Sequence, residues 1–415
     1  MNNKAVFALY LVVMLDVSGQ GILFPALNTL IIDPANGFLP AETTKATRNL
    51  YYGLIIGSFF FCWFFGATMI ASFSDDVGRK KALVICLIGS VIGYILTLAG
   101  IYAQSVTLLV LGRVVAGFTA GSQSVSQAAI IDISTVETRT KNLGKIVAAT
   151  ASGLAFGPVI GGIFSDKNLW SELNVSVPVY IITICLLLTL AMVLIYFKDT
   201  RAIQSDKKFS ILSGFSELGA AIQFRPIRDI SIVFFLCVLS LTLFYIYCIV
   251  FLFKQFDFTT FENSAAMLMM GAAMAVTSWF LVKPLEDRFS KKMLVSASLF
   301  LMAFFQILFL ISGNGYLALA SIFPLFMAYG IAYTNCLNIF SLSVPESRQG
   351  WAMGISISLL TLGGGIASFL GEELISIFDQ LPFVVSTVLL VLGGLLALIL
   401  RIVQPYEKSD PLPDS

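Results

Sequence analysis

Residues 108–122 read LLVLGRVVAGFTAGS, and residues 153–162 read GLAFGPVIGG. Both stretches are apolar and carry glycines four positions apart, which share one face of a helix. Arg113 lies inside the first stretch, and Asp132 follows at the end of the same apolar segment. A guanidinium group inside a bilayer is unfavourable by about 2.5–3.5 kcal/mol on insertion scales, so Arg113 is expected to have a partner and a function.

The composition of the chain is that of a polytopic membrane protein. Of its 415 residues, 58% are hydrophobic and 12% are charged, and the mean hydropathy is +0.91. A soluble core does not need so much apolar surface, whereas each membrane span needs about 20 apolar residues. The net charge of +1 gives no indication of a nucleic-acid partner.

The sequence offers little for enzymatic, metal or redox chemistry. It has no histidine, which excludes a histidine metal site or proton relay. It also shows no nucleophile–base set and no nucleotide-binding loop, so neither an enzyme nor a cofactor is expected. Six cysteines lie in apolar stretches without Cys-x-x-Cys spacing and are expected to be packing residues: Cys62, Cys86, Cys185, Cys237, Cys248 and Cys336.

Twelve apolar segments are long enough to cross a bilayer. We expect them at residues 5–27, 49–74, 82–103, 106–131, 142–164, 177–197, 229–253, 262–282, 293–312, 316–341, 351–375 and 382–401. With the N-terminus inside, the inner segments hold 20 of the 25 lysines and arginines, the outer segments hold 4, and Arg113 is the remaining one. This bias predicts that both termini are cytoplasmic. The first 25 residues are not expected to be a cleaved signal peptide, because the apolar run is too long.

The predicted fold is an all-α membrane protein with two pseudo-symmetric bundles of six helices. We expect an N-terminal bundle at 1–197, a cytoplasmic linker at 198–228, a C-terminal bundle at 229–401 and a cytoplasmic tail at 402–415. In the linker, apolar residues recur at helical spacing, at Leu212, Phe215, Leu218 and Ile222. This pattern fits either a short amphipathic helix on the membrane surface or a plain linker.

A loop motif occurs once in each half. Spans 2 and 3 are joined by Asp75-Asp76-Val77-Gly78-Arg79-Lys80-Lys81, and spans 8 and 9 by Asp287-Arg288-Phe289-Ser290-Lys291-Lys292. The first aspartates of the two copies are 212 residues apart, which is about half the chain. Internal duplication of six spans is typical of secondary transporters, whose substrate site lies between the halves near the middle of the membrane.

Three further motifs lie inside the spans. Span 1 contains Asp16-Val17-Ser18-Gly19-Gln20-Gly21-Ile22-Leu23-Phe24-Pro25. Span 4 contains Arg113, Gly117 and Gly121, and span 5 contains Gly153, Gly157, Pro158, Gly161 and Gly162. Glycines four apart let a neighbouring helix approach closely, and a proline removes one backbone hydrogen bond and kinks the helix.

Together, these motifs resemble the major facilitator superfamily, and within it the twelve-span drug:proton antiporters that include tetracycline exporters. The resemblance extends over nearly the whole chain. It departs from the family loop pattern Gly-x-x-x-Asp-Arg-x-Gly-Arg-Lys at two positions, because Ala71 replaces the first glycine and Asp76 the first arginine. The resemblance implies a secondary active transporter that works by alternating access and is usually a monomer. Compact loops suggest a bacterial inner membrane.

The resemblance also implies a conformational latch between the halves. Gly78 permits a tight turn, and Asp75 is suited to face the N-terminus of a helix from the other half. In the family, the residue at Arg79 pairs with the one at Asp132, and the second copy of the loop adds Asp287 and Arg288 as candidates. The alternative is that the loop has no latch role and that its positive charges only reflect its position on the cytoplasmic side of the membrane.

Asp16 and Arg113 are the candidates for proton coupling. Burial favours the protonated form of a carboxyl group, and a nearby arginine favours its charged form. These opposed effects can let Asp16 exchange a proton at working pH. The hypothesis is that Asp16 carries the proton and Arg113 tunes it, and the alternative is a static structural pair.

The span 5 motif bears on the direction of transport. In the family it resembles, the motif is associated with exporters and with closing the path between the halves against leak, although uptake proteins carry versions of it. It therefore favours a proton-coupled exporter of small amphiphilic compounds. A proton-coupled importer of a nutrient such as an amino acid, nucleoside, sugar or siderophore stays open.

Polar and aromatic residues inside the spans are candidates for substrate binding. Singly, such residues more often join neighbouring helices. With 36 phenylalanines and one central acid, the site is expected to suit a neutral, zwitterionic or singly cationic small molecule. The candidates are Gln20, Gln123, Gln127, Tyr245, Tyr247, Gln306, Tyr329, Tyr333, Asn335 and Asn338.

Overall fold

The computed structural model describes residues 3–31, 34, 37–165, 173–199, 219–256, 258 and 260–403. In this part of the chain all regular structure is helical, with no strand, so the predicted all-α fold is confirmed. Twelve helical segments of the described chain are long and apolar enough to cross a membrane, and each overlaps one of the twelve predicted spans. This agreement has a simple cause: in lipid, a chain must satisfy its backbone groups internally, so long apolar segments become helices.

The elements follow one another in two groups. The first group is α1 (Asn3–Ile31), α2 (Lys45–Val77), α3 (Arg79–Tyr102), α4 (Val106–Thr119), α5 (Ser122–Asp132), α6 (Val136–Ser165) and α7 (Ser176–Tyr196). The second group begins with α9 (Arg225–Phe256), α10 (Thr260–Val276), the π-helical turn η2 (Thr277–Leu281), α11 (Val282–Glu286) and α12 (Lys291–Ile311). It ends with α13 (Gly315–Leu342), the 3₁₀ turn η3 (Glu346–Arg348), α14 (Gln349–Ile377) and α15 (Leu381–Ile399).

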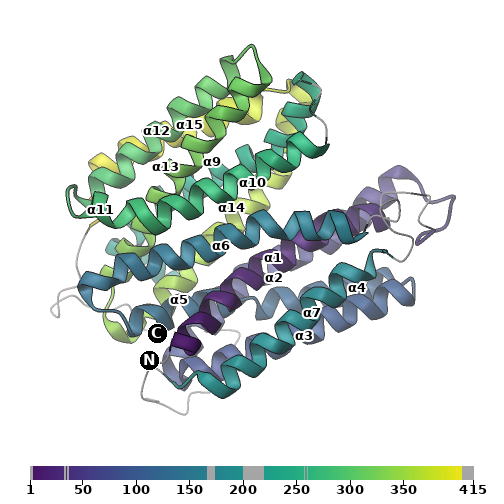
Figure 1. Cartoon of the computed structure of the whole chain (residues 1–415), viewed down its shortest axis with the longest axis horizontal. Helices are drawn as coiled ribbons and strands as arrows, with labels where there is room; N and C mark the ends of the chain where they lie inside the picture. The colour runs from purple at the N-terminus through teal and green to yellow at the C-terminus, as the bar shows by residue number, and fades with distance from the viewer. Residues whose placement is uncertain are drawn as a thin grey trace.

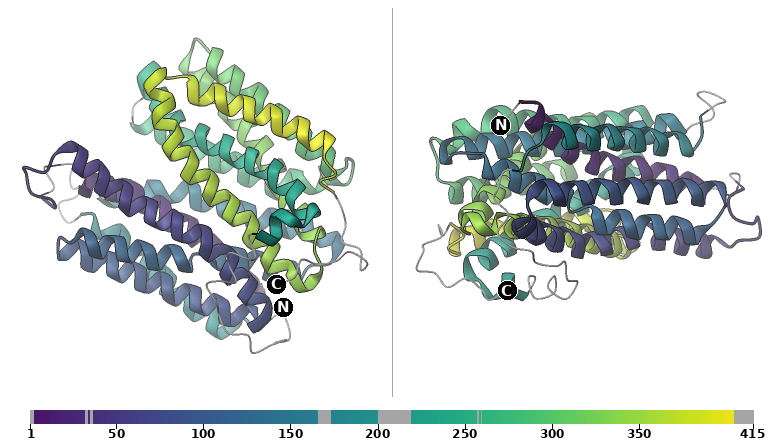
Figure 2. Two further views of the ribbon diagram at one scale, coloured as in Figure 1. Left: turned by 180° about the vertical axis from the view of Figure 1, so that it is seen from behind. Right: turned by 90° about the horizontal axis from the view of Figure 1, so that it is seen from below.

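The two groups form two bundles that meet at one end. Figure 1 shows α1 to α7 on one side and α9 to α15 on the other, converging where the two termini lie and diverging toward the opposite end, and the views of Figure 2 agree. Helices α2 and α14 pack together across the bundles, as do α6 and α10. We call the end that carries the termini the terminal end.

The fourth span is two helices rather than the single helix that its hydropathy suggests. Helix α4 ends at Thr119 and α5 begins at Ser122. At the break, the Trp63 indole N–H donates to the Ala120 carbonyl oxygen at 2.9 Å. A Cβ at Gly121 would lie 2.8 Å from Cβ of Ile70, so glycine lets the break pack tightly against α2. The break leaves free backbone N–H groups at the start of α5.

Most of the predicted linker lies outside the described residues. Leu212, Phe215 and Leu218 of the proposed amphipathic helix are among these. Residues 219–223 are helical, and Ile222 is 69% exposed. The predicted tail is described only up to residue 403.

Candidate functional site

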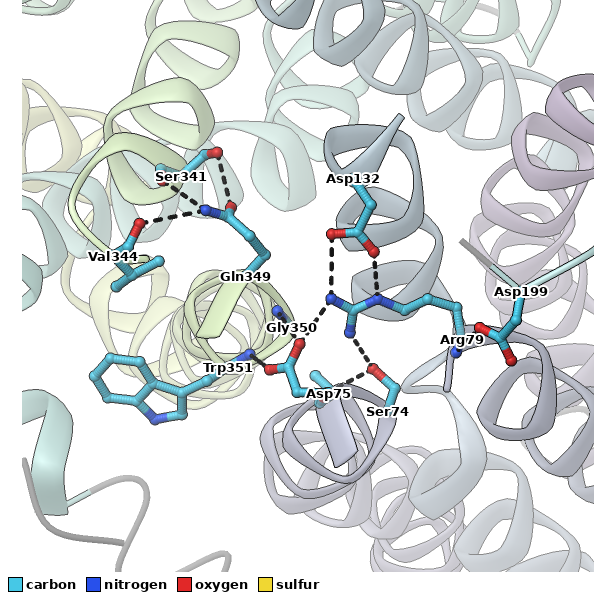
Figure 3. Close-up of polar contacts among 11 residues, drawn as sticks. Ser74, Asp75, Arg79, Asp132, Asp199, Ser341, Val344, Gln349, Gly350 and Trp351 are labelled. Atoms are coloured by element: carbon cyan, nitrogen blue, oxygen red, sulfur yellow. Dashed lines mark hydrogen bonds and ion pairs between the residues drawn. The ribbon is translucent and has the colours of Figure 1, made fainter. Parts of the chain in front are cut away.

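At the terminal end, Asp75 joins the two bundles. Its carboxylate accepts hydrogen bonds from the backbone N–H groups of Gly350 and Trp351, both at 3.0 Å (Figure 3). These two residues form the first turn of α14, where free N–H groups and the helix dipole favour a negative charge. Gln349 holds this helix start in place, because its side chain exchanges hydrogen bonds with Ser341 of α13.

Arg79 lies between two carboxylates at this point. It is completely buried, its Nη2 lies 2.7 Å from Asp75, and its Nε lies 2.9 Å from Asp132. Its Nη1 donates to the Ser74 hydroxyl at 2.6 Å, and its backbone N–H donates to Asp199 at 2.7 Å. Removing one partner from a buried pair of this kind costs about 3–5 kcal/mol. We call Asp75, Arg79, Asp132, Gly350 and Trp351 the latch cluster.

The alanine that replaces the family's first loop glycine is matched by glycines on the opposite helix. A Cβ at Gly354 of α14 would lie 2.9 Å from the Ala71 methyl group and 2.8 Å from Cα of Thr68. Gly350 approaches the same stretch of α2. One turn further on, the Thr68 and Ser358 hydroxyls are hydrogen-bonded at 2.7 Å. The close approach of α2 and α14 is therefore retained although the small residues lie on the other helix.

The second copy of the loop makes a different contact. Asp287 pairs with Lys283 of its own helix at 2.7 Å, and both Asp287 and Arg288 are exposed. The neighbouring Glu286 forms the buried contact instead, an ion pair with Lys291. Among the described residues, no hydrogen bond or ion pair joins the side chain of Asp287 or Arg288 to the first bundle.

Glu286 reaches the first bundle through Asn338. The Asn338 amide donates to Glu286 at 2.8 Å and to the Thr140 hydroxyl of α6 at 2.6 Å. This bridge lies at the terminal end of the interface, so Asn338 is used for contact between the bundles. The substrate-binding role expected for Asn338 stays a prediction.

Asp16 lies against the break between α4 and α5. Its carboxyl group is buried, accepts a hydrogen bond from the Ser122 hydroxyl, and interacts with the backbone N–H of Gln123. Both partners belong to the first turn of α5. The charge of a deprotonated Asp16 is therefore stabilised by a helix N-terminus, a partner that the sequence did not reveal.

Arg113 lies apart from Asp16 in the first bundle. It is 2% exposed, donates to the Thr97 hydroxyl at 3.2 Å, and lies 5.0 Å from the Tyr94 ring and 5.6 Å from the Phe59 ring. Across residues 3–31 and 37–165, no ion pair joins it to Asp16. Aromatic faces attract a cation by about 0.5–2 kcal/mol each, so they partly replace a carboxylate partner. Any influence of Arg113 on Asp16 acts at longer range, with Tyr94 near both.

The span 5 motif packs α6 against α1, the helix that carries Asp16. A Cβ at Gly157 would lie 2.7 Å from the Ser18 carbonyl oxygen, and Pro158 Cδ lies 2.7 Å from a Cβ built at Gly21. Gly162 does not belong to this face, because a Cβ at this position would meet no neighbouring atom within 4 Å. The glycines of the face are Gly153, Gly157 and Gly161.

Several substrate candidates are bonded inside one bundle or are only partly buried. Gln306 donates to the Phe383 carbonyl oxygen at 2.8 Å and accepts from Ser386 at 3.2 Å, both within the second bundle. Gln20 and Tyr245 are half-buried, whereas Tyr247 is buried. The Gln306 contacts join helices of the same bundle, whereas the Gln20 amide nitrogen is buried without a hydrogen-bond partner among the described residues.

Other candidates lie buried with unused hydrogen-bonding capacity. Gln123 and Gln127 of α5 and Asn335 of α13 are completely buried, and Tyr333 is 1% exposed. Among the described residues, both glutamine amides, the Tyr333 hydroxyl and the Asn335 amide oxygen have no hydrogen-bond partner. Leaving a buried polar group unpaired costs about 1–3 kcal/mol. Tyr329 packs its ring on Tyr333, with centroids 5.4 Å apart.

Known structures share this fold. The human organic anion transporter MFSD10 (TETRAN) superposes with a TM-score of 0.76 at 18% identity, covering 96% of this chain and 100% of that one. The proton:xylose symporter XylE superposes with a TM-score of 0.75 at 16% identity, covering 97% of each chain. At these identities the likeness concerns the fold alone.

Proteins related in sequence are more similar to this chain than the solved structures are. The class D tetracycline resistance protein of Salmonella ordonez is 26% identical over 99% of each chain. The quinolone resistance protein NorA of Staphylococcus aureus (strain MSSA476) is 24% identical over 96% of each chain. The family model of the Major Facilitator Superfamily matches residues 6–283 and 230–414. The chain therefore belongs to the Major Facilitator Superfamily, a family of multi-pass membrane transporters.

Proposed function

We propose that this transporter is a proton-coupled exporter of small amphiphilic compounds. The environment of Asp16 is the main support for proton coupling. Its carboxyl group is buried and accepts a hydrogen bond from Ser122 at the start of α5. Burial favours its protonated form, and the helix N-terminus favours its charged form. Asp16 can then gain and lose a proton as its surroundings change during the cycle. Arg113 acts on this site through its field rather than through an ion pair.

We further propose that the two bundles have the boundaries expected from the sequence, 1–197 and 229–401. The latch cluster controls alternating access between them. In the conformation described, α2 and α14 are joined at the terminal end through Asp75. With both termini in the cytoplasm, this is an outward-facing state, and inward opening requires these contacts to break. The proposed location is a bacterial inner membrane, and the proposed active form is a monomer.

The direction of transport is the finer part of the proposal. Export is supported by similarity to proteins named for resistance to tetracycline and to quinolones, together with the span 5 motif. Import of a nutrient with protons is the second candidate, because a proton:xylose symporter has the same fold. Identities of 24–26% leave the substrate itself open to experiment.

Transport in proteoliposomes tests both points. The protein would be reconstituted with a pH-sensitive dye inside, and compounds of cationic, neutral and zwitterionic type would be added. We expect substrate and protons to move in opposite directions, and Asp16→Asn to reduce substrate-driven proton movement to the level of empty liposomes. Asp379→Asn, which removes an exposed carboxylate beyond α14, is the matched control and should transport normally. Movement of substrate and protons in the same direction would establish import, and full coupling in Asp16→Asn would refute the role of Asp16.

A further inference from the structure

Two glutamines on α5 hold four amide atoms that the described protein leaves without hydrogen bonds. Gln123 and Gln127 are one helical turn apart, so they share a face of α5. Both are completely buried. In the part of the chain that the structure describes, neither the oxygen nor the nitrogen of either amide has a partner. Buried polar side chains in proteins are nearly always bonded, so this arrangement points to a partner outside the chain.

The second bundle faces Gln127 with aromatic rings. Tyr333 of α13 lies close enough to Gln127 for a weak side-chain hydrogen bond, and among the described residues no hydrogen bond of normal geometry reaches its hydroxyl. The Tyr333 ring packs against Tyr329 and Phe234, with centroid distances of 5.4 and 5.5 Å. The amides belong to one bundle and the rings to the other. The interface that separates during alternating access therefore runs between them.

The position of these residues along α5 places them between the proton site and the latch cluster. Helix α5 begins at Ser122, which bonds Asp16, and ends at Asp132, which bonds Arg79. Gln127 is midway, about 7.5 Å along the axis from each end at 1.5 Å per residue. A molecule that enters when the bundles part at the terminal end passes Gln127 before it reaches Asp16.

We infer that Gln123, Gln127 and Tyr333 form a loading subsite for an uncharged, flat polar group with neighbouring hydrogen-bond donors and acceptors. A carboxamide beside a carbonyl or hydroxyl is such a group. Each glutamine offers both a donor and an acceptor, and a flat group can stack on the tyrosine ring. None of the three side chains carries a charge, so the subsite selects by hydrogen bonding rather than by ion pairing. The inference rests on the proposed function, because it places the subsite on the transport path.

Binding of two probes to the full-length protein in lipid nanodiscs tests the subsite. Tetracycline carries a carboxamide among carbonyl and hydroxyl groups, whereas tetraphenylphosphonium is aromatic and charged but has no hydrogen-bonding group. Gln123→Leu and Gln127→Leu should each weaken tetracycline binding about tenfold, or about 1.4 kcal/mol, and change tetraphenylphosphonium binding less than twofold. The matched control is Gln380→Leu, an exposed glutamine before α15, which should bind both probes as the wild type does.

Thermal unfolding separates a ligand subsite from simple helix contact. Because the amides make no hydrogen bond of normal geometry within the described protein, the leucine variants should keep or raise the unfolding midpoint. A lowered midpoint with equal loss of both probes would overturn the subsite, and so would unchanged tetracycline binding. A wild-type protein that binds only tetraphenylphosphonium, or neither probe, would refute the assigned ligand class. Selective loss of tetracycline binding in a protein that moves no protons would keep the subsite and refute the proposed function.

Discussion

Replacing Asp75 by asparagine should release the two bundles at the terminal end. The carboxylate joins α2 to the first turn of α14 through two hydrogen bonds of 3.0 Å, and it pairs with Arg79 at 2.7 Å. Asparagine has nearly the same shape but carries no charge and has one acceptor oxygen instead of two. The variant therefore tests the charge of the latch cluster while leaving the packing of α2 on α14 unchanged.

The size of the effect follows from these contacts. Hydrogen bonds to charged groups contribute about 1.5–3 kcal/mol each, and a neutral bond contributes about 1 kcal/mol. One of the two bonds to α14 should be lost and the other weakened, while Arg79 keeps Asp132 as a partner. The closed contact should weaken by about 3 kcal/mol. Since 1.4 kcal/mol is a factor of ten, the equilibrium between closed and open terminal ends should shift by about 100-fold.

Pulsed EPR distances across the terminal end measure this shift directly. Spin labels would be placed at Lys81→Cys and Ser347→Cys, both exposed positions on opposite bundles, after replacement of the six native cysteines. Asp75→Asn should move most of the population to longer distances. Asp76→Asn makes the same charge change one position along and should keep the short distance. If both variants opened the interface equally, or neither did, the assignment of the latch to Asp75 would be refuted.

Two further variants test contacts inside the first bundle. Gly157→Leu should lower the thermal unfolding midpoint and disturb proton coupling, because its Cβ would lie 2.7 Å from the Ser18 carbonyl oxygen and overpacking costs about 1–3 kcal/mol. Gly162→Leu, where no atom lies within 4 Å, is the control, and equal destabilisation of both would contradict the packing. Thr97→Val should also lower the midpoint, with a loss of about 1.5–3 kcal/mol in the free energy of unfolding, because it removes the hydroxyl that accepts from Arg113. An unchanged midpoint in Thr97→Val would show that Tyr94 and Phe59 stabilise the guanidinium group without the Thr97 hydroxyl.

The fold could be predicted from the sequence because, in lipid, the backbone of a long apolar segment must satisfy its hydrogen bonds internally. Long apolar segments give helices, and their count and approximate bounds follow from hydropathy alone. The break in the fourth span could not be predicted in this way. At the break, the indole of Trp63 bonds the Ala120 carbonyl from a position 57 residues earlier, a contact that hydropathy does not reveal. Gly121 alone was an ambiguous signal, since glycine in a span also serves close packing.

The candidate site was predictable where a short motif fixes the geometry. The contacts of Asp75, Arg79 and Asp132 follow the pattern that the resemblance implied, while their role in transport stays a proposal. The prediction was less successful where the partner of a residue depends on a neighbouring element. Asp16 depends on the start of α5, which exists only because the span is broken. In the second loop, Glu286 makes the buried contact one position before the predicted Asp287.

The closed terminal end combines strong contacts with unsatisfied ones, and this combination suits a protein that must open. The latch cluster joins the bundles through charged hydrogen bonds of about 1.5–3 kcal/mol each. The same interface buries the amides of Gln123 and Gln127 without partners among the described residues, and each unpaired group costs about 1–3 kcal/mol. The two effects are similar in size and opposite in sign. Opening would hydrate the amides as it breaks the latch, so the two states can differ by only a few kcal/mol, within the range that one proton or one substrate can reverse.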